Sequence, residues 1–236
     1  MLKFVTLNYM NNMINTLIPP EIKGDSFYQA LEMLSSNQGI KTILEIGSSS
    51  GEGSTEALVT GVRARIDRDS VRLFCMELSK PRFEKLEAHY ASDLFVKCYN
   101  LSSVALDEFP SVEEVSNFHA MTRSQLPKYA PLDVLLQWLK DDIDYVKGAG
   151  SHFNGVRHIK KVNNIIDFDL VLIDGSEFTG EREYYSIAGA KVIALDDVNA
   201  HKCFNVYQIL KNHVAYRLIF EDLTLRQGFA IFQRRY

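Results

Sequence analysis

Cysteine is scarce in this chain, and its three cysteines are not spaced for a shared site. Cys75, Cys98 and Cys203 lie far apart, and none belongs to a C-x-x-C pair. A disulfide framework or a zinc site needs more cysteines at closer spacing, so this usage favours a reducing compartment. No run approaches the roughly 20 apolar residues of a membrane span. Asparagines interrupt any signal-peptide core at positions 8, 11, 12 and 15. We therefore expect a cytoplasmic protein.

The chain also lacks a basic excess and the common phosphate-binding motifs. Lys and Arg number 26 against 30 Asp and Glu, which gives a formal net charge of -4. This balance favours neither nucleic acid nor an anionic membrane as a partner. There is no G-x-x-x-x-G-K-[ST] loop and no G-x-G-x-x-G fingerprint. With 236 residues, 46% of them hydrophobic, the chain is most simply a single domain over residues 1–236.

Short apolar runs alternate with helical patterns along most of the chain. Helices are predicted at residues 52–65 and 80–91. Buried strands are predicted at residues 41–46, 71–77, 93–99, 168–174 and 190–197. Such alternation indicates a parallel sheet with helices on both faces. Two last strands, at residues 215–223 and 226–235, are too close for a helix between them and predict an antiparallel hairpin. The fold class is therefore α/β, a Rossmann-like doubly wound sheet of seven strands.

The alternation breaks between the third and fourth strands. Residues 101–166 are too many for a plain connection, so we expect a helical insertion that covers the carboxyl ends of the strands as a lid. Helical patterns occur there at residues 111–119, 132–146 and 156–166. We assign the large aromatic side chains of this part and of the segment after the fourth strand to the core, namely Trp138, Phe153, Phe178, Tyr184 and Tyr185.

The first strand runs into a turn of small residues. The stretch "ILEIGSSSGEGST" contains three glycines and four serines before a helix begins. Glycine permits positive φ and close approach to the backbone, and the free N–H groups of a helix N-terminus attract polar ligand groups. A tight turn with no ligand is the alternative. The second strand ends at Glu77, whose carboxylate could accept both hydroxyls of a ribose or could be a solvated surface group.

Together, these strand ends resemble a known family. "LEIGSSSGEGS" followed by "FCMEL" is similar to the cofactor half of class I S-adenosylmethionine-dependent methyltransferases, especially small-molecule O-methyltransferases of the catechol and caffeoyl-CoA type. "DLVLIDGSEFTGEREYY" and "AKVIALDDVN" are similar to the later strand ends of that group and of related bacterial methyltransferases. The resemblance does not extend to residues 101–166. It implies methyl transfer from S-adenosylmethionine to a small-molecule acceptor, with oxygen as the expected target, and it is compatible with a homodimer.

The resemblance also implies a cofactor site. Glu45 would organise the amino-acid end of the cofactor, Gly47 would pass closest to it, and Glu77 would hold the ribose. Asn100, Ser102 or Ser103 would lie near the adenine. The full set of expected cofactor-binding residues is Glu45, Gly47, Ser48, Gly51, Gly53, Ser54, Glu77, Leu78, Ser102 and Asp174.

Three carboxylates follow the fourth and fifth strands and suggest a second possibility. In cation-dependent relatives of the resembled family, the positions of Asp174, Asp196 and Asp197 hold a metal such as magnesium, and oxygen ligands of this kind suit it. Plain capping of strand ends and helices is the alternative. Two departures from the family weaken the metal assignment. The family has an aspartate-asparagine pair after the fifth strand, and Asp197 stands in the place of the asparagine. Glu177 stands where the family has a lysine.

Three carboxylates that converge repel one another unless a cation, a lysine or a shared proton offsets the charge. The sequence places no lysine beside Asp174, and Lys202 is the nearest cation after the fifth strand. We therefore predict either a bound divalent ion or one carboxyl group with a raised pKa that can serve as general base.

Asp174 and His201 are the candidate catalytic bases. His201 follows the fifth strand and would titrate near neutral pH, although a lone histidine there is more often a surface or capping residue. Two other functions remain open. One is a non-catalytic protein of the same fold that binds the cofactor or a partner, which the change at Glu177 motivates. The other is a nicotinamide-dependent oxidoreductase, for which the glycine spacing is a poor match.

Overall fold

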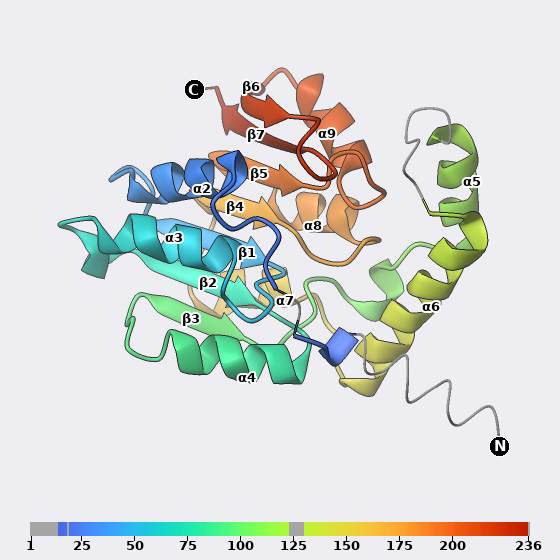
Figure 1. Cartoon of the computed structure of the whole chain (residues 1–236), viewed down its shortest axis with the longest axis horizontal. Helices are drawn as coiled ribbons and strands as arrows, with labels where there is room; N and C mark the ends of the chain where they lie inside the picture. The colour runs from blue at the N-terminus through green and yellow to red at the C-terminus, as the bar shows by residue number, and fades with distance from the viewer. Residues whose placement is uncertain (1–13, 18, 123–129, 236) are drawn as a thin grey trace. The chain divides into compact units, whose positions relative to one another are not determined.

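The chain folds into an α/β structure with one seven-stranded mixed sheet, whose strands are labelled in Figure 1. The structure is a computed structural model and describes residues 14–17, 19–122 and 130–235. The strand order is β3-β2-β1-β4-β5-β7-β6. The order and the antiparallel end strands confirm the sequence prediction of a Rossmann-like sheet with a C-terminal hairpin. The chain divides into two compact units, one of residues 1–102 and 168–170 and one of residues 103–167 and 171–236.

The first unit is built on three parallel strands. These are β1 (Thr42–Ile46), β2 (Arg72–Met76) and β3 (Val96–Tyr99). β1 and β2 are buried except at their first residues, which explains their nearly continuous apolar sequences. The helices of this unit are α2 (Ser26–Ser36), α3 (Ser54–Arg63) and α4 (Lys80–His89). α2 and α3 lie side by side (Figure 1), and a side chain at Gly61 of α3 would meet the backbone oxygen of Glu32 at 2.2 Å.

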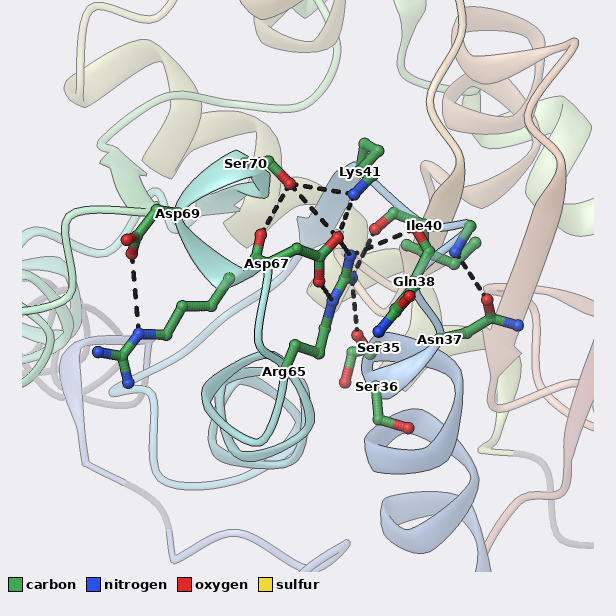
Figure 2. A network of polar contacts seen from close by, with 12 residues as sticks. Ser35, Ser36, Asn37, Gln38, Ile40, Lys41, Arg65, Asp67, Asp69 and Ser70 are labelled. Carbon is green, nitrogen blue, oxygen red and sulfur yellow. Dashed lines mark hydrogen bonds and ion pairs between the residues drawn. The ribbon is translucent and has the colours of Figure 1, made fainter.

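A buried arginine joins three segments of the first unit at the amino end of the sheet (Figure 2). The side chain of Arg65 is 1% exposed. Its guanidinium donates to the backbone oxygens of Ser35 and Ile40 and to both carboxylate oxygens of Asp67. The ammonium of Lys41 also contacts Asp67. These hydrogen bonds connect the end of α2, the start of β1 and the segment after α3.

The second unit holds the other strands and helices. Its strands are β4 (Leu170–Ile173), whose first residue belongs to the first unit, β5 (Val192–Asp196), β6 (Tyr216–Asp222) and β7 (Phe229–Arg234). β7 pairs antiparallel with both β5 and β6. The helices are α5 (Val112–Thr122), α6 (Leu132–Gly148), α7 (Gly155–Val162), α8 (Gly180–Ile187) and α9 (Phe204–Lys211). Short 3-10 turns occur at Arg68–Ser70 in the first unit and at Leu106–Glu108 in the second.

The segment expected to be a helical insertion does form helices α5, α6 and α7, although residues 123–129 within it lie outside the described part. Val115 of α5 and Leu135 and Leu139 of α6 form a buried cluster with Phe178, which follows β4. The segment therefore packs against the loop at the carboxyl end of β4. Its expected role as a lid stays a prediction.

The assignment of all five large aromatic side chains to the core was partly wrong. Phe178 and Tyr184 are buried, but Trp138, Phe153 and Tyr185 are 45%, 45% and 52% exposed. The face of α6 that is buried consists of Leu135, Leu139 and Val146. Trp138 lies beside that face, so the helical spacing alone did not decide its burial.

None of the helices in the described ranges combines the length and apolar character needed to cross a membrane. The N-terminal residues 1–13, for which the sequence raised the question of a signal peptide, lie outside the described part of the chain.

Candidate functional site

The turn after β1 has the strained backbone that its small residues suggest. Gly47 and Gly51 have φ values of 90° and 85°, and Ser49 between them has a φ of 49°. The N–H groups of Gly47 and Ser48 donate to the backbone oxygen of Met76 at 3.0 and 2.9 Å, which ties the turn to the end of β2. Positive φ is costly for residues other than glycine. The contacts around Ser49 must therefore hold it in this conformation.

Glu45 lies at the base of this turn and is completely buried. Its Oε2 accepts hydrogen bonds from the hydroxyls of Ser48 at 2.7 Å and Thr55 at 2.6 Å. Its Oε1 has no hydrogen-bond partner at normal distance among the described residues. Burial raises the pKa of Glu45, and the hydroxyl hydrogen bonds only partly oppose that rise. The carboxyl group therefore holds the turn and the start of α3 together from the inside.

Packing within the chain explains two of the three glycines. A Cβ at Gly51 would lie 2.7 Å from Cε2 of Tyr90 and 2.8 Å from Cδ1 of Leu86, both in the region of α4. A Cβ at Gly53 would lie 3.0 Å from Pro20. Gly51 is thus needed for close packing whether or not a ligand binds, and a side chain at Gly53 would make a tight contact. The sequence prediction that all three admit a ligand still awaits a test.

The end of β2 carries a second buried carboxylate, that of Glu77. Its Oε1 accepts a hydrogen bond of 2.6 Å from the N–H of Ser79, and the residue is 9% exposed. Burial raises the pKa of Glu77, while backbone N–H donors and the charge of Arg82 lower it. Asn100, after β3, donates from Nδ2 to the backbone oxygens of Glu77 and Leu78, both at 2.8 Å. These contacts fix the backbone on both sides of the Glu77 carboxylate.

The first unit therefore brings most of the expected cofactor-binding residues to two neighbouring strand ends. Ser54 is the first residue of α3, and Ser102 is buried after β3. Ser103 differs, because its hydroxyl donates to the buried carboxylate of Glu183 in the second unit, 2.6 Å away. The expected members in the first unit are Glu45, Gly47, Ser48, Gly51, Gly53, Ser54, Glu77, Leu78 and Ser102.

The second unit brings the three predicted carboxylates together. Each of Asp174, Asp196 and Asp197 offers an oxygen, and these oxygens all lie within 4.8 Å of one another. Asp174 follows β4, and Asp196 ends β5. Asp197 has a φ of 54°, an uncommon value for a residue other than glycine.

Two cations already contact this cluster. Nζ of Lys202 lies 2.7 Å from Oδ1 of Asp174 and 2.7 Å from Oδ2 of Asp197. Nη1 of Arg226 lies 2.8 Å from both carboxylate oxygens of Asp196. Burial raises the pKa of Asp174 to about 8, against the opposing charge of Lys202. The sequence did not place a lysine beside Asp174, because the contact joins residues 28 positions apart.

His201 lies next to the cluster in an apolar setting. Its ring centroid is 4.2 Å from that of Phe118 and 5.4 Å from that of Phe178. Burial lowers the pKa of His201 to about 4, so the imidazole is neutral at physiological pH. Its Nδ1 lies 3.2 Å from the backbone oxygen of Glu177, and this carbonyl acceptor requires the proton on Nδ1. The backbone N–H of His201 also donates to the Glu177 carboxylate at 3.0 Å.

Sequence reasoning missed two acids of the second unit, the partly buried Asp142 and the buried Glu183. Asp142 of α6 accepts a hydrogen bond from the hydroxyl of Ser176, and burial raises its pKa. Glu183 of α8 is completely buried and accepts from Thr179 at 2.6 Å in addition to Ser103. The sequence held one usable signal, since both acids lie on the apolar side of amphipathic helices. A charged residue on such a face is unusual unless it has partners.

Comparison with solved structures identifies the fold. An O-methyltransferase from Bacillus cereus in complex with SAH has 15% sequence identity and a TM-score of 0.53, with 98% of this chain and 91% of that chain covered. The O-methyltransferase TomG from Streptomyces achromogenes, in complex with SAM, has 13% identity, coverage of 98% and 89%, and a TM-score of 0.54. The SAH-bound methyltransferase PaMTH1 from Podospora anserina has 13% identity, coverage of 98% and 88%, and a TM-score of 0.53.

No protein-family model matches the chain. No curated protein matches it either. At these low identities the structural likeness shows the fold, which is that of the O-methyltransferases and runs along almost the whole chain.

Proposed function

We propose that this chain transfers a methyl group from S-adenosylmethionine to an oxygen of a small-molecule acceptor. The observation that carries the proposal is the turn at Gly47, with its positive φ, beside the buried carboxylate of Glu77, on a fold shared with O-methyltransferases. Three similar structures were solved with SAM or SAH bound.

The residues of the first unit fit such a cofactor. Glu77 offers a buried carboxylate as an acceptor for ribose hydroxyls, and the bond from Ser79 holds it in place. Gly47 lacks a side chain and has positive φ, so its backbone can contact a ligand closely. Oε1 of Glu45 is buried without a partner at normal distance among the described residues, which suits a polar ligand group or an ordered water.

The chemistry needs little beyond positioning and loss of a proton. S-adenosylmethionine, held by these residues, would supply the methyl group: a C–O bond to the acceptor would form as the C–S bond of the sulfonium breaks, which leaves S-adenosylhomocysteine. Asp174 accepts the proton of the acceptor hydroxyl and returns it to solvent. A carboxyl group that titrates near neutrality suits this role, whereas the low pKa of His201 makes its imidazole a weak base.

The helical segment at residues 101–166 is the proposed cover of the acceptor pocket. Its support is the packing of Leu135 and Leu139 on Phe178 and the hydrogen bond between Asp142 and Ser176, two residues after Asp174. Replacing residues 111–150 with a short Gly/Ser linker should leave the affinity for S-adenosylhomocysteine unchanged and abolish transfer. Loss of cofactor binding in a folded variant would instead give the segment a role in the cofactor site.

Calorimetric titration with S-adenosylhomocysteine and with NADH separates the three candidate functions. Binding of S-adenosylhomocysteine alone supports methyl transfer, and transfer of a labelled methyl group to any small-molecule oxygen separates an enzyme from a binding protein of the same fold. Heat with NADH alone supports an oxidoreductase. No heat with either ligand would contradict the proposal.

A further inference from the structure

We infer that the ammonium of Lys202 takes the place of a divalent cation in the cluster of Asp174, Asp196 and Asp197. The inference deepens the proposed function and rests on it for its meaning, because it makes methyl transfer independent of a resident metal. The donor set alone would suit magnesium, since three carboxylate oxygens lie within 4.8 Å of one another. The contacts that these carboxylates already make within the protein argue against a bound metal.

Each carboxylate of the cluster already has a fixed positive partner. Lys202 contacts Asp174 and Asp197 at 2.7 Å, and its side chain is 10% exposed. Arg226 contacts both oxygens of Asp196 at 2.8 Å, with exposed fractions of 15% and 8% for the two side chains. One guanidinium nitrogen thus contacts both oxygens of a nearly buried carboxylate, which is a charge-assisted interaction.

The balance of charge leaves little attraction for another cation. The Lys202 ammonium and the Arg226 guanidinium face the three carboxyl groups, so even with all three ionised only a single negative charge remains. A divalent ion between Asp174 and Asp197 would lie within a few ångströms of the Lys202 ammonium, and two like charges at that distance in a poorly solvated site repel strongly. Magnesium therefore requires the lysine to leave first.

The backbone holds Lys202 where it is. A Cβ at Gly180, the first residue of α8, would lie 2.0 Å from the backbone oxygen of Lys202, so the two segments pack as closely as a glycine allows. On one side of Lys202, the N–H of His201 donates to Glu177 at 3.0 Å. On the other side, the thiol of Cys203 points to the backbone oxygen of Ile173 at 3.9 Å. These backbone contacts hold Lys202 in position, so its ammonium stays beside the carboxylates without a metal ion.

The test is a titration with manganese, followed by the electron paramagnetic resonance signal of free Mn²⁺, without cofactor or acceptor. The wild-type protein should bind Mn²⁺ no more tightly than about 1 mM, the weak end of carboxylate sites. Lys202→Ala opens the position and should bind at least tenfold more tightly. Adding Asp197→Asn to that variant should remove the gain. Lys211→Ala, which changes a solvent-exposed lysine of α9, is the matched control and should behave as wild type.

The melting temperature gives a second measurement of metal binding, and it also shows whether the Lys202→Ala variant is folded. Mn²⁺ should raise the melting temperature of Lys202→Ala, or of Lys202→Gln if alanine does not fold, and leave that of wild type unchanged. Tight Mn²⁺ binding by wild type, or no gain in either Lys202 variant, would overturn the inference. Neither result depends on S-adenosylhomocysteine binding, so this failure is distinct from failure of the proposed function.

Discussion

The hydroxyl of Thr55 donates a hydrogen bond of 2.6 Å to the carboxylate of Glu45, which joins the first turn of α3 to β1 inside the core. A carboxylate in that position is costly to ionise, because burial removes its water. The hydroxyls of Thr55 and Ser48 recover part of this cost, and the pKa of Glu45 still lies above its usual value of 4.5. The turn after β1 is therefore held by a group that weakens the fold when it is charged.

Glu45→Gln should stabilise the protein at neutral and alkaline pH. The pKa of Glu45 is higher in the folded protein than in the unfolded chain, so the protonated carboxyl group contributes stability. That contribution is complete below the unfolded pKa and is lost as the pH rises through the folded pKa. The variant keeps a neutral group throughout. Its melting temperature should match that of wild type near about pH 4 and exceed it near about pH 8.

Glu52→Gln is the control for this pH profile. The hydrogen bond from Lys85 lowers the pKa of Glu52, so this carboxylate contributes stability above its unfolded pKa and loses it as the pH falls. The control should be less stable than wild type at about pH 8, the opposite sign. A Glu45→Gln variant that is less stable than wild type at both pH values would show that Glu45 stabilises the turn as an anion.

Gly51→Ala should destabilise the first unit by about 1–3 kcal/mol, the scale of positive-φ strain and overpacking. Gly51 has a φ of 85°, and the added methyl group would lie 2.7 Å from the Tyr90 ring. Gly148→Ala is the matched control, because a Cβ at this last residue of α6 meets nothing within 4 Å and φ is not positive. The control should be neutral or slightly stabilising. Equal stabilities in urea denaturation would mean that the turn relaxes around the methyl group.

Arg65→Ala should lower the free energy of unfolding by about 3 kcal/mol, the cost of leaving buried acceptors without their charged donor. Its guanidinium donates hydrogen bonds to the backbone oxygens of Ser35 and Ile40 (Figure 2). Arg68→Ala is the control, since this side chain is 56% exposed and pairs with Asp69 at 3.7 Å. The control should change little. Chemical denaturation that gave equal losses for the two variants would contradict the structural role of Arg65.

The sheet could be predicted from the sequence because its signals are local. Each buried strand appears as a short apolar run, and the two last strands are too close for a crossover helix. The helix α2 was not assigned, and neither were α8 and α9, whose eight residues each give only about two turns of periodicity. The sequence also predicted that Asp174, Asp196 and Asp197 would come together, because the carboxyl ends of neighbouring parallel strands share one edge.

What the sequence could not provide were contacts between distant side chains. Lys202 was named as the nearest cation after the fifth strand, but the sequence gave no distance from it to Asp174. Gly51 suggested a ligand, whereas Tyr90, which is 39 residues away, explains its lack of a side chain. Asp142 lies on the apolar side of α6, but the sequence does not show that it contacts Ser176. In each case the cause is tertiary packing, which has no local pattern.

Calorimetric titration of Glu77→Ala beside wild type with S-adenosylhomocysteine tests the central claim most directly. Wild type should bind the ligand, and Glu77→Ala should bind about 1.5–3 kcal/mol more weakly, the scale of hydrogen bonds to a charged group. Glu87→Ala, which changes an exposed carboxylate of α4, should bind as wild type does. Absence of binding by wild type, or equal affinities of wild type and a folded Glu77→Ala variant, would contradict the assignment of Glu77 and the Gly47 turn to the cofactor.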